Sequence, residues 1–278
     1  MMEAMRKSGK QLPSSSEKVP RKRNFSQSPH KLTRNGWLPN YHGAWAMVSI
    51  PALLGILRFG FAWTQILLIT CWIIGYFCFF AITLWLKSHG RRRYLPAVLS
   101  YFLPSALMGI LLICYEQRIL WWIPVYLPLV TISFLASWYR KERSLVNDVA
   151  TITAATLLLP IVAMLSGANL NSLEVASLTF SLLSYFIGTV FYVKTNIRHR
   201  ASLKWYLASI SFHGIAASVI NYIYFLDYVP FSHVLLWLVI LMRAVFVPLY
   251  GARFGWLSAK QIGIAEFIIS FLFLFTLI

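Results

Sequence analysis

From about residue 42 to the C-terminus, the chain alternates between long apolar stretches and short polar connections. A bilayer has a hydrocarbon core about 30 Å thick, which a helix of roughly 20 apolar residues can cross. Lipid offers no hydrogen-bond partners, so a spanning segment must satisfy its own backbone polar groups, as a helix does. The short alternating strands of a transmembrane barrel are absent from the sequence. The pattern therefore predicts an all-α protein, a polytopic transmembrane helical bundle.

The apolar stretches predict about nine membrane spans in a single transmembrane domain, residues 35–278. The spans are expected at about 42–57, 65–86, 95–115, 119–138, 145–165, 175–193, 203–226, 232–250 and 261–278. The first hairpin is the weakest part of this pattern, because the connection from Arg58 to Trp63 is short and partly apolar. A re-entrant pair there would lower the number of spans and leave the later connections on the same sides.

Composition supports a membrane protein and sets the N-terminal residues apart. The chain is 59% hydrophobic and only 12% charged, which is unlike an average soluble domain. Residues 1–34, by contrast, are polar and contain nine Lys and Arg residues. We expect this leader to be disordered and cytoplasmic, and to contact the anionic head groups of the lipid bilayer.

The positive charge follows the connections between the apolar stretches. A net charge of +17 would suggest a nucleic-acid binder in a soluble chain, but here every second connection is cation-rich and the others carry at most one Arg. Short basic loops resist translocation, so we expect the N-terminus inside, the C-terminus outside and no nucleic-acid partner. The cation-rich connections carry Lys87, Arg91, Arg92 and Arg93; Arg140, Lys141 and Arg143; Lys194, Arg198, Arg200 and Lys204; and Arg253 and Lys260.

The sequence contains no recognisable metal or cofactor motif. Cys71, Cys78 and Cys114 lie in apolar stretches without the spacing of metal ligands, so we interpret them as reduced, small hydrophobic residues. A Gly-rich phosphate loop, a metal-spaced His pair and a Ser/His/Asp arrangement are also absent from the sequence. We therefore expect neither a metal nor a cofactor.

Several short runs mark a family. Residues 41–47 read Tyr-His-Gly-Ala-Trp-Ala-Met and are followed by Pro51. Further runs are Arg143-Ser144-Leu145, residues 188–195 with Ile197-Arg198, and residues 260–263 with Glu266. In these runs the chain resembles the YwiC-like family of bacterial integral membrane proteins, from about residue 37 to the C-terminus. The resemblance implies a multi-pass protein of the bacterial plasma (inner) membrane and does not imply a particular activity.

Ionisable side chains inside the predicted spans are costly to bury, so each is a candidate functional residue. Arg243 and Glu266 lie in the cytoplasmic halves of the eighth and last spans, where they can pair. Lys194 and Arg198 follow the end of the sixth span, and His42 opens the first. We expect these five residues to form a ligand site.

Asp148 at the start of the fifth span and His213 near the middle of the seventh are secondary candidates. Each candidate also has a structural interpretation: Asp148 can complement its helix dipole, Lys194 can reach lipid phosphates, and Arg243 and Glu266 can join two helices. Taken together, the excess of cations predicts a positive vestibule that faces the cytoplasm and favours an anion, such as a phosphate, a carboxylate or a lipid head group.

The function predicted from these residues is the binding or transport of a small or lipid-linked anionic compound. One alternative is a membrane assembly protein that acts by helix packing, for which the sequence names no protein partner. The other is an intramembrane enzyme with a layout similar to that of UbiA-type prenyltransferases. Those enzymes bind a diphosphate through Asp-rich motifs and Mg²⁺, whereas residues 87–93 and 194–198 here contain no carboxylate. The sequence therefore argues against a metal-dependent diphosphate site, and it leaves the question of enzymatic activity open while favouring a protein that is not an enzyme.

Overall fold

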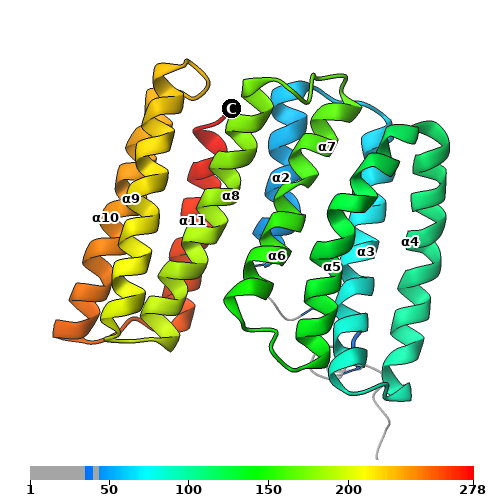
Figure 1. The fold of residues 1–278 in the computed structure, drawn as a ribbon, viewed down its shortest axis with the longest axis horizontal. Helices are drawn as coiled ribbons and strands as arrows, with labels where there is room; N and C mark the ends of the chain where they lie inside the picture. Colours follow the sequence, from blue (N-terminus) through cyan, green and yellow to red (C-terminus); the bar gives the residue numbers. More distant parts are fainter. Residues whose placement is uncertain (1–34, 40–43) are drawn as a thin grey trace, which may run out of the picture.

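The computed structural model describes residues 35–39 and 44–278, and all regular structure in these residues is helical (Figure 1). The fold class is therefore confirmed. The predicted leader, residues 1–34, and His42 lie outside the described residues. The longer helices are α2 (Ala44–Phe59), α3 (Thr64–Lys87), α4 (Leu95–Tyr115), α5 (Ile123–Trp138), α6 (Leu145–Thr156), α7 (Leu158–Leu165), α8 (Leu173–Val193), α9 (Leu203–Phe225), α10 (Phe231–Phe254) and α11 (Ala259–Phe275).

Short helical turns extend three of these helices. The 3₁₀ turns η1 (Arg92–Tyr94) and η2 (Gln117–Trp122) precede α4 and α5, and a π-helical turn, η3 (Lys194–Arg198), follows α8. The fifth predicted span is divided at Leu157 into α6 and α7. Pro160 has no N–H to donate to the carbonyl of Thr156, so the helical hydrogen-bond pattern is interrupted at this place.

Length and composition indicate how the helices relate to a membrane. Seven helical segments in the described part of the chain, from α3 to α10, are long and apolar enough to cross a bilayer. The helix α2 has 16 residues and α11 has 17, and a helix rises about 1.5 Å per residue. Both are therefore shorter than the about 30 Å hydrocarbon core. The molecule is a multi-pass membrane protein, and the count of nine spans stays a prediction.

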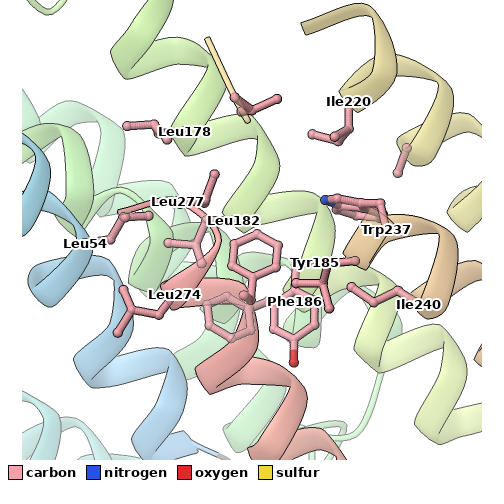
Figure 2. Packing of buried hydrophobic residues seen from close by; sticks show 14 of the residues in the cluster. Leu54, Leu178, Leu182, Tyr185, Phe186, Ile220, Trp237, Ile240, Leu274 and Leu277 are labelled. Atoms are coloured by element: carbon pink, nitrogen blue, oxygen red, sulfur yellow. The ribbon is translucent and has the colours of Figure 1, made fainter. Parts of the chain in front are cut away.

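Two apolar clusters hold the bundle together. One joins α8 to α2 and to α9, α10 and α11, and its fully buried side chains include Leu54, Tyr185 and Trp237 (Figure 2). The other joins α2 and α7 to α3 and α4. The helices α2 and α7 approach closely because Gly55 has no side chain: an added Cβ would lie 2.7 Å from Cγ1 of Val162.

The cation-rich connections gather at one end of the bundle. Lys87 Nζ lies 2.9 Å from Oε1 of Glu142, which joins the end of α3 to the connection between α5 and α6. Lys194 Nζ donates to the carbonyl of Arg143 at 3.0 Å, and Arg200 Nη2 donates to that of Leu257 at 3.4 Å. Figure 1 shows these connections at its lower end and the C-terminus at the opposite end. Which side of the membrane each end faces stays a prediction.

Candidate functional site

A polar stripe on α8 positions the candidate site. Ser172 caps the start of α8, since its side chain accepts a hydrogen bond from the backbone N–H of Val175. Along the helix, Ser181, Tyr185 and Thr189 recur at every fourth residue, so they share one face. This face contacts α10 and α11 through the hydrogen bonds described below. The stripe therefore places hydroxyl groups where two other helices bring charged side chains.

Arg243 of α10 and Glu266 of α11 form a buried ion pair against this stripe. Arg243 Nη1 contacts Oε1 of Glu266, and the two side chains are only 8% and 11% exposed. The second carboxylate oxygen, Oε2, accepts a hydrogen bond from Thr189 Oγ1 at 3.0 Å. The guanidinium carbon of Arg243 also lies 4.1 Å from the centre of the Tyr192 ring. The pair therefore joins three helices inside the bundle.

The guanidinium of Arg243 is incompletely paired. Its Nε and Nη2 are buried, and neither has a hydrogen-bond partner among the described residues. A buried charged donor without an acceptor costs free energy, so such positions in a native structure call for an explanation. Here they leave Arg243 strongly dependent on Glu266, the carboxylate with which it pairs.

A groove of about 920 Å³ lies between α8 and α11, and residues of α2 and α6 also line it. At the cation-rich end its wall contains Asp148, Lys194, Arg198 and Lys260. Glu266 lies further along the groove, and the rest of the wall is mostly apolar. The groove thus connects the cation-rich end of the bundle to the buried ion pair.

The cations of the groove differ in how they are compensated. Lys194 Nζ lies 2.8 Å from Oδ2 of Asp148, and the Lys194 side chain is 7% exposed. The π-helical turn that starts at Lys194 carries Arg198 to the exposed surface next to it. Within the described ranges, no carboxylate lies within ion-pair distance of Arg198 or Lys260. These two side chains give the groove mouth a surplus of positive charge.

Comparisons with known proteins agree with the resemblance seen in the sequence. Residues 38–163, which contain α2 to α6 and most of α7, match the family model described as "YwiC-like protein". The resemblance to the YwiC-like family is confirmed.

Two curated relatives extend the YwiC-like match. An uncharacterised protein of Haemophilus influenzae is 26% identical over 254 residues, which are 87% of this chain and 97% of the relative. The uncharacterised protein YwiC of Bacillus subtilis is 29% identical over 184 residues, which are 63% of this chain and 73% of the relative. No solved structure matches the chain. Both relatives are bacterial, and their names do not assign a ligand or an activity.

The structure brings most of the sequence candidates together. Asp148, Lys194, Arg198 and Glu266 line the groove. Arg243 does not line it, and lies behind Glu266 on the side of α10. The reason is that Glu266 and Thr189 stand between the guanidinium and the groove.

His213 lies apart from the groove. Its Nδ1 is 2.7 Å from the carbonyl of Ser209 on its own helix, and its ring packs against Gly188, where an added Cβ would lie 2.9 Å from Nε2. It is fully buried between α8 and α9. This placement favours a role in helix packing over contact with a ligand. His42, the remaining candidate, lies outside the described residues.

Sequence reasoning missed other groove residues. Lys260, Tyr185 and Ser270 also line the groove. The Tyr185 hydroxyl lies 2.8 Å from Ser270 Oγ, which donates to the carbonyl of Glu266 at 2.8 Å. The repeat of hydroxyl residues along α8 was the available signal, because uncharged polar groups at helical spacing mark a face that needs partners.

A second buried polar cluster, around His233, was also missed. Trp237 Nε1 can only donate a hydrogen bond, and it lies 3.1 Å from His233 Nε2. His233 Nε2 is therefore the acceptor and carries no proton. Ser181 Oγ lies 2.7 Å from the same nitrogen, and His233 Nδ1 is 2.8 Å from Thr276 Oγ1. His233 is therefore neutral, with the proton on Nδ1, and it joins α8, α10 and α11 at the end opposite the groove mouth.

The described residues do not gather a metal-binding set. Among them, no group of three or more His, Cys, Asp or Glu side chains lies close enough to hold a metal ion. The free cysteines Cys71, Cys78 and Cys114 belong to α3 and α4, away from the groove.

Proposed function

We propose that this protein binds, and moves, a small or lipid-linked anionic compound in the groove between α8 and α11. The observation that supports the proposal is the convergence of Lys194, Arg198 and Lys260 on one groove wall. The positive-inside rule assigns the cation-rich end to the cytoplasm. In this proposal the protein lies in the bacterial inner membrane and takes its ligand from the cytoplasmic side.

Charge counting favours an anion. The groove wall holds three cations and two carboxylates. Lys194 is paired with Asp148, and Glu266 is paired with Arg243 from outside the groove. Two cations, Arg198 and Lys260, are therefore left over. At the edge of a low-dielectric groove, such a surplus attracts an anion, which can accept charge-assisted hydrogen bonds from both.

Each residue has a distinct part in the proposal. Arg198 and Lys260 bind the anionic group, and Asp148 holds Lys194 in place beside them. Glu266 keeps Arg243 buried and gives the groove a neutral wall. Arg243 is thus a positioning residue in the proposal, in contrast to the direct ligand contact expected from the sequence.

The test compares a charged probe with its neutral analogue. Hexyl phosphate and 1-hexanol are titrated calorimetrically into the protein in phosphatidylcholine nanodiscs, with empty nanodiscs as the blank. Wild type should bind hexyl phosphate in preference to hexanol. Arg198→Ala should weaken hexyl phosphate binding about tenfold or more, because one charged hydrogen bond contributes about 1.5–3 kcal/mol.

Arg253→Ala is the matched control. Arg253 is exposed near the same end of the bundle but does not line the groove, so its removal should leave the affinity unchanged. Equal affinity for hexyl phosphate and hexanol, or an Arg198→Ala variant that binds like wild type, would refute the proposal. A stoichiometric protein partner in the purified material, together with those results, would favour the assembly alternative.

A further inference from the structure

The groove is large for a simple anion. Its volume of about 920 Å³ lies in the range of about 300–1,000 Å³ typical of sites that enclose drug-sized ligands. A free phosphate held by Arg198 and Lys260 would leave most of this space empty. The size of the groove therefore calls for a ligand that extends well beyond its anionic group.

The groove runs along the helices to a depth of about one lipid leaflet. On α11 its wall extends from Lys260 to Ser270, ten residues, which is about 15 Å along a helix. This is half of the about 30 Å hydrocarbon core. A ligand that fills the groove thus reaches from the membrane surface to about the bilayer midplane.

In the deep part of the groove, the polar groups of the wall need no hydrogen-bond partner from a ligand. Glu266 is paired with Arg243 and Thr189, and Ser270 donates to the carbonyl of Glu266. Tyr185 is in turn hydrogen-bonded to Ser270. Because these groups satisfy one another, hydrocarbon can pack against them without leaving a polar atom unpaired.

The groove also opens sideways. Three of its wall residues, Trp45, Ile264 and Phe267, are 40%, 53% and 55% exposed. Apolar side chains that are accessible at the edge of a membrane bundle can contact lipid tails, which are equally apolar. An apolar chain can therefore pass between the groove and the surrounding leaflet without crossing water, while its charged group stays at the cation-rich end.

We infer that the ligand is an amphiphile: a lipid-like molecule with an anionic head group at Arg198 and Lys260 and a hydrocarbon chain in the groove. It enters laterally from the leaflet at the cation-rich end. This inference rests on the proposed function and narrows it, since it selects the lipid-linked ligand over the small one.

Alkyl phosphates of increasing length separate the two ligand classes. Methyl, butyl and hexyl phosphate share one head group and are titrated into the protein in phosphatidylcholine nanodiscs, with empty nanodiscs subtracted. If the chain enters the groove, the affinity should rise about fourfold for each methylene buried, the factor expected for transfer of such a group from water to an apolar site. Equal affinity for the three probes would overturn the inference.

A pair of glycines provides matched variants. Gly263 lines the groove, and a Cβ added to it meets no atom within 4 Å, so the side chain of Gly263→Leu has room to enter the groove and narrow it. Gly214 on α9 has equally open space but lies outside the groove. Gly263→Leu should weaken hexyl phosphate binding tenfold or more and leave methyl phosphate binding unchanged. Gly214→Leu should change neither.

The outcomes distinguish this inference from the proposed function. Arg198→Ala could weaken binding of all three probes while chain length and Gly263→Leu have no effect. That result would support the proposed anion site and refute the inference that the ligand is an amphiphile. If no probe binds better than its neutral alcohol, the proposed function itself fails. Chain-length dependence that disappears in Gly263→Leu supports the amphiphile.

Discussion

Near the groove, the Arg243–Glu266 pair is the side-chain interaction whose loss should cost the most free energy. Both side chains are almost fully buried, and two nitrogens of Arg243 lack a partner among the described residues. Removing one member of such a pair leaves the other buried and uncompensated, which costs far more than the pair itself contributes. The stability of the α8–α10–α11 contact should therefore depend on Glu266 more than on any surface carboxylate.

Glu266→Gln should lower the free energy of unfolding by about 3–5 kcal/mol, because Arg243 loses the one counter-charge that it has among the described residues. Glu174→Gln serves as the control, since the Arg58–Glu174 pair is 31% and 37% exposed and should contribute at most about 1 kcal/mol. Unfolding in mixed detergent micelles, followed by circular dichroism, measures both. Equal destabilisation by the two variants would show that burial of the pair does not matter.

For single residues, the sequence predicted how far along its helix each charged side chain lies, but not which neighbouring helix or groove the side chain faces. An Arg and a Glu inside apolar stretches need partners, and their distances from the helix ends place them at similar heights, so the Arg243–Glu266 pair was foreseeable. The rotation of α10 that turns Arg243 away from the groove depends on packing against α8 and α11. For the same reason Lys260 looked like an ordinary loop cation in the sequence, although it lines the groove.

Among the elements, the contact between α2 and α7 depends on a glycine. A Cβ on Gly55 would lie 2.7 Å from Val162 Cγ1, whereas a Cβ on Gly75 of α3 would meet its nearest neighbour, Ser105 Oγ, at 3.4 Å. The first distance is too short for a methyl group, and the second is an ordinary contact. The α2–α7 contact in turn holds α2 against the rest of the bundle, where Trp45 borders the groove.

Gly55→Ala should destabilise the protein by about 1–3 kcal/mol, because the two helices must move apart. Gly75→Ala should be neutral or stabilising by up to about 1 kcal/mol, since alanine is the better helix former. The free energies of unfolding of the two variants, measured side by side, check the prediction. A Gly55→Ala variant as stable as Gly75→Ala would mean that α2 and α7 are not in close contact.

The length of each apolar stretch predicted the helices well, because crossing a bilayer imposes one length on all of them. The break at Leu157 and the π-helical turn at Lys194 were not foreseen. The break follows from the missing N–H of Pro160. The π-helical turn is likewise a local change in hydrogen bonding, and it carries Arg198 next to the groove. Neither changes the apolar pattern from which the spans were predicted.

On the scale of the whole molecule, the cation-rich connections meet at one end of the bundle, as the hydrogen bonds and the ion pair between them show. The sequence predicted this grouping because each crossing reverses the chain direction. The charges of the loops predict the membrane side of that end, since short basic loops resist translocation. The arrangement of the helices alone does not select a side.

Single cysteines test the orientation in a chain whose Cys71, Cys78 and Cys114 are replaced by Ala. Arg91→Cys and Asn171→Cys lie at exposed positions on opposite ends of the bundle. With the cation-rich end in the cytoplasm, a membrane-impermeant maleimide should label Asn171→Cys in intact spheroplasts and Arg91→Cys only after lysis. The reverse pattern would invert the topology and place the groove mouth outside.

The most direct test of the proposed anion site is an experimental structure of the protein purified from its own membrane without added lipid. The account predicts density in the groove between α8 and α11, with an anionic group within hydrogen-bond distance of Arg198 or Lys260 and a chain running past Gly263 toward Ser270. A groove without density, in a map that resolves the Lys194–Asp148 pair, would contradict it. So would a bound molecule that contacts none of the cations.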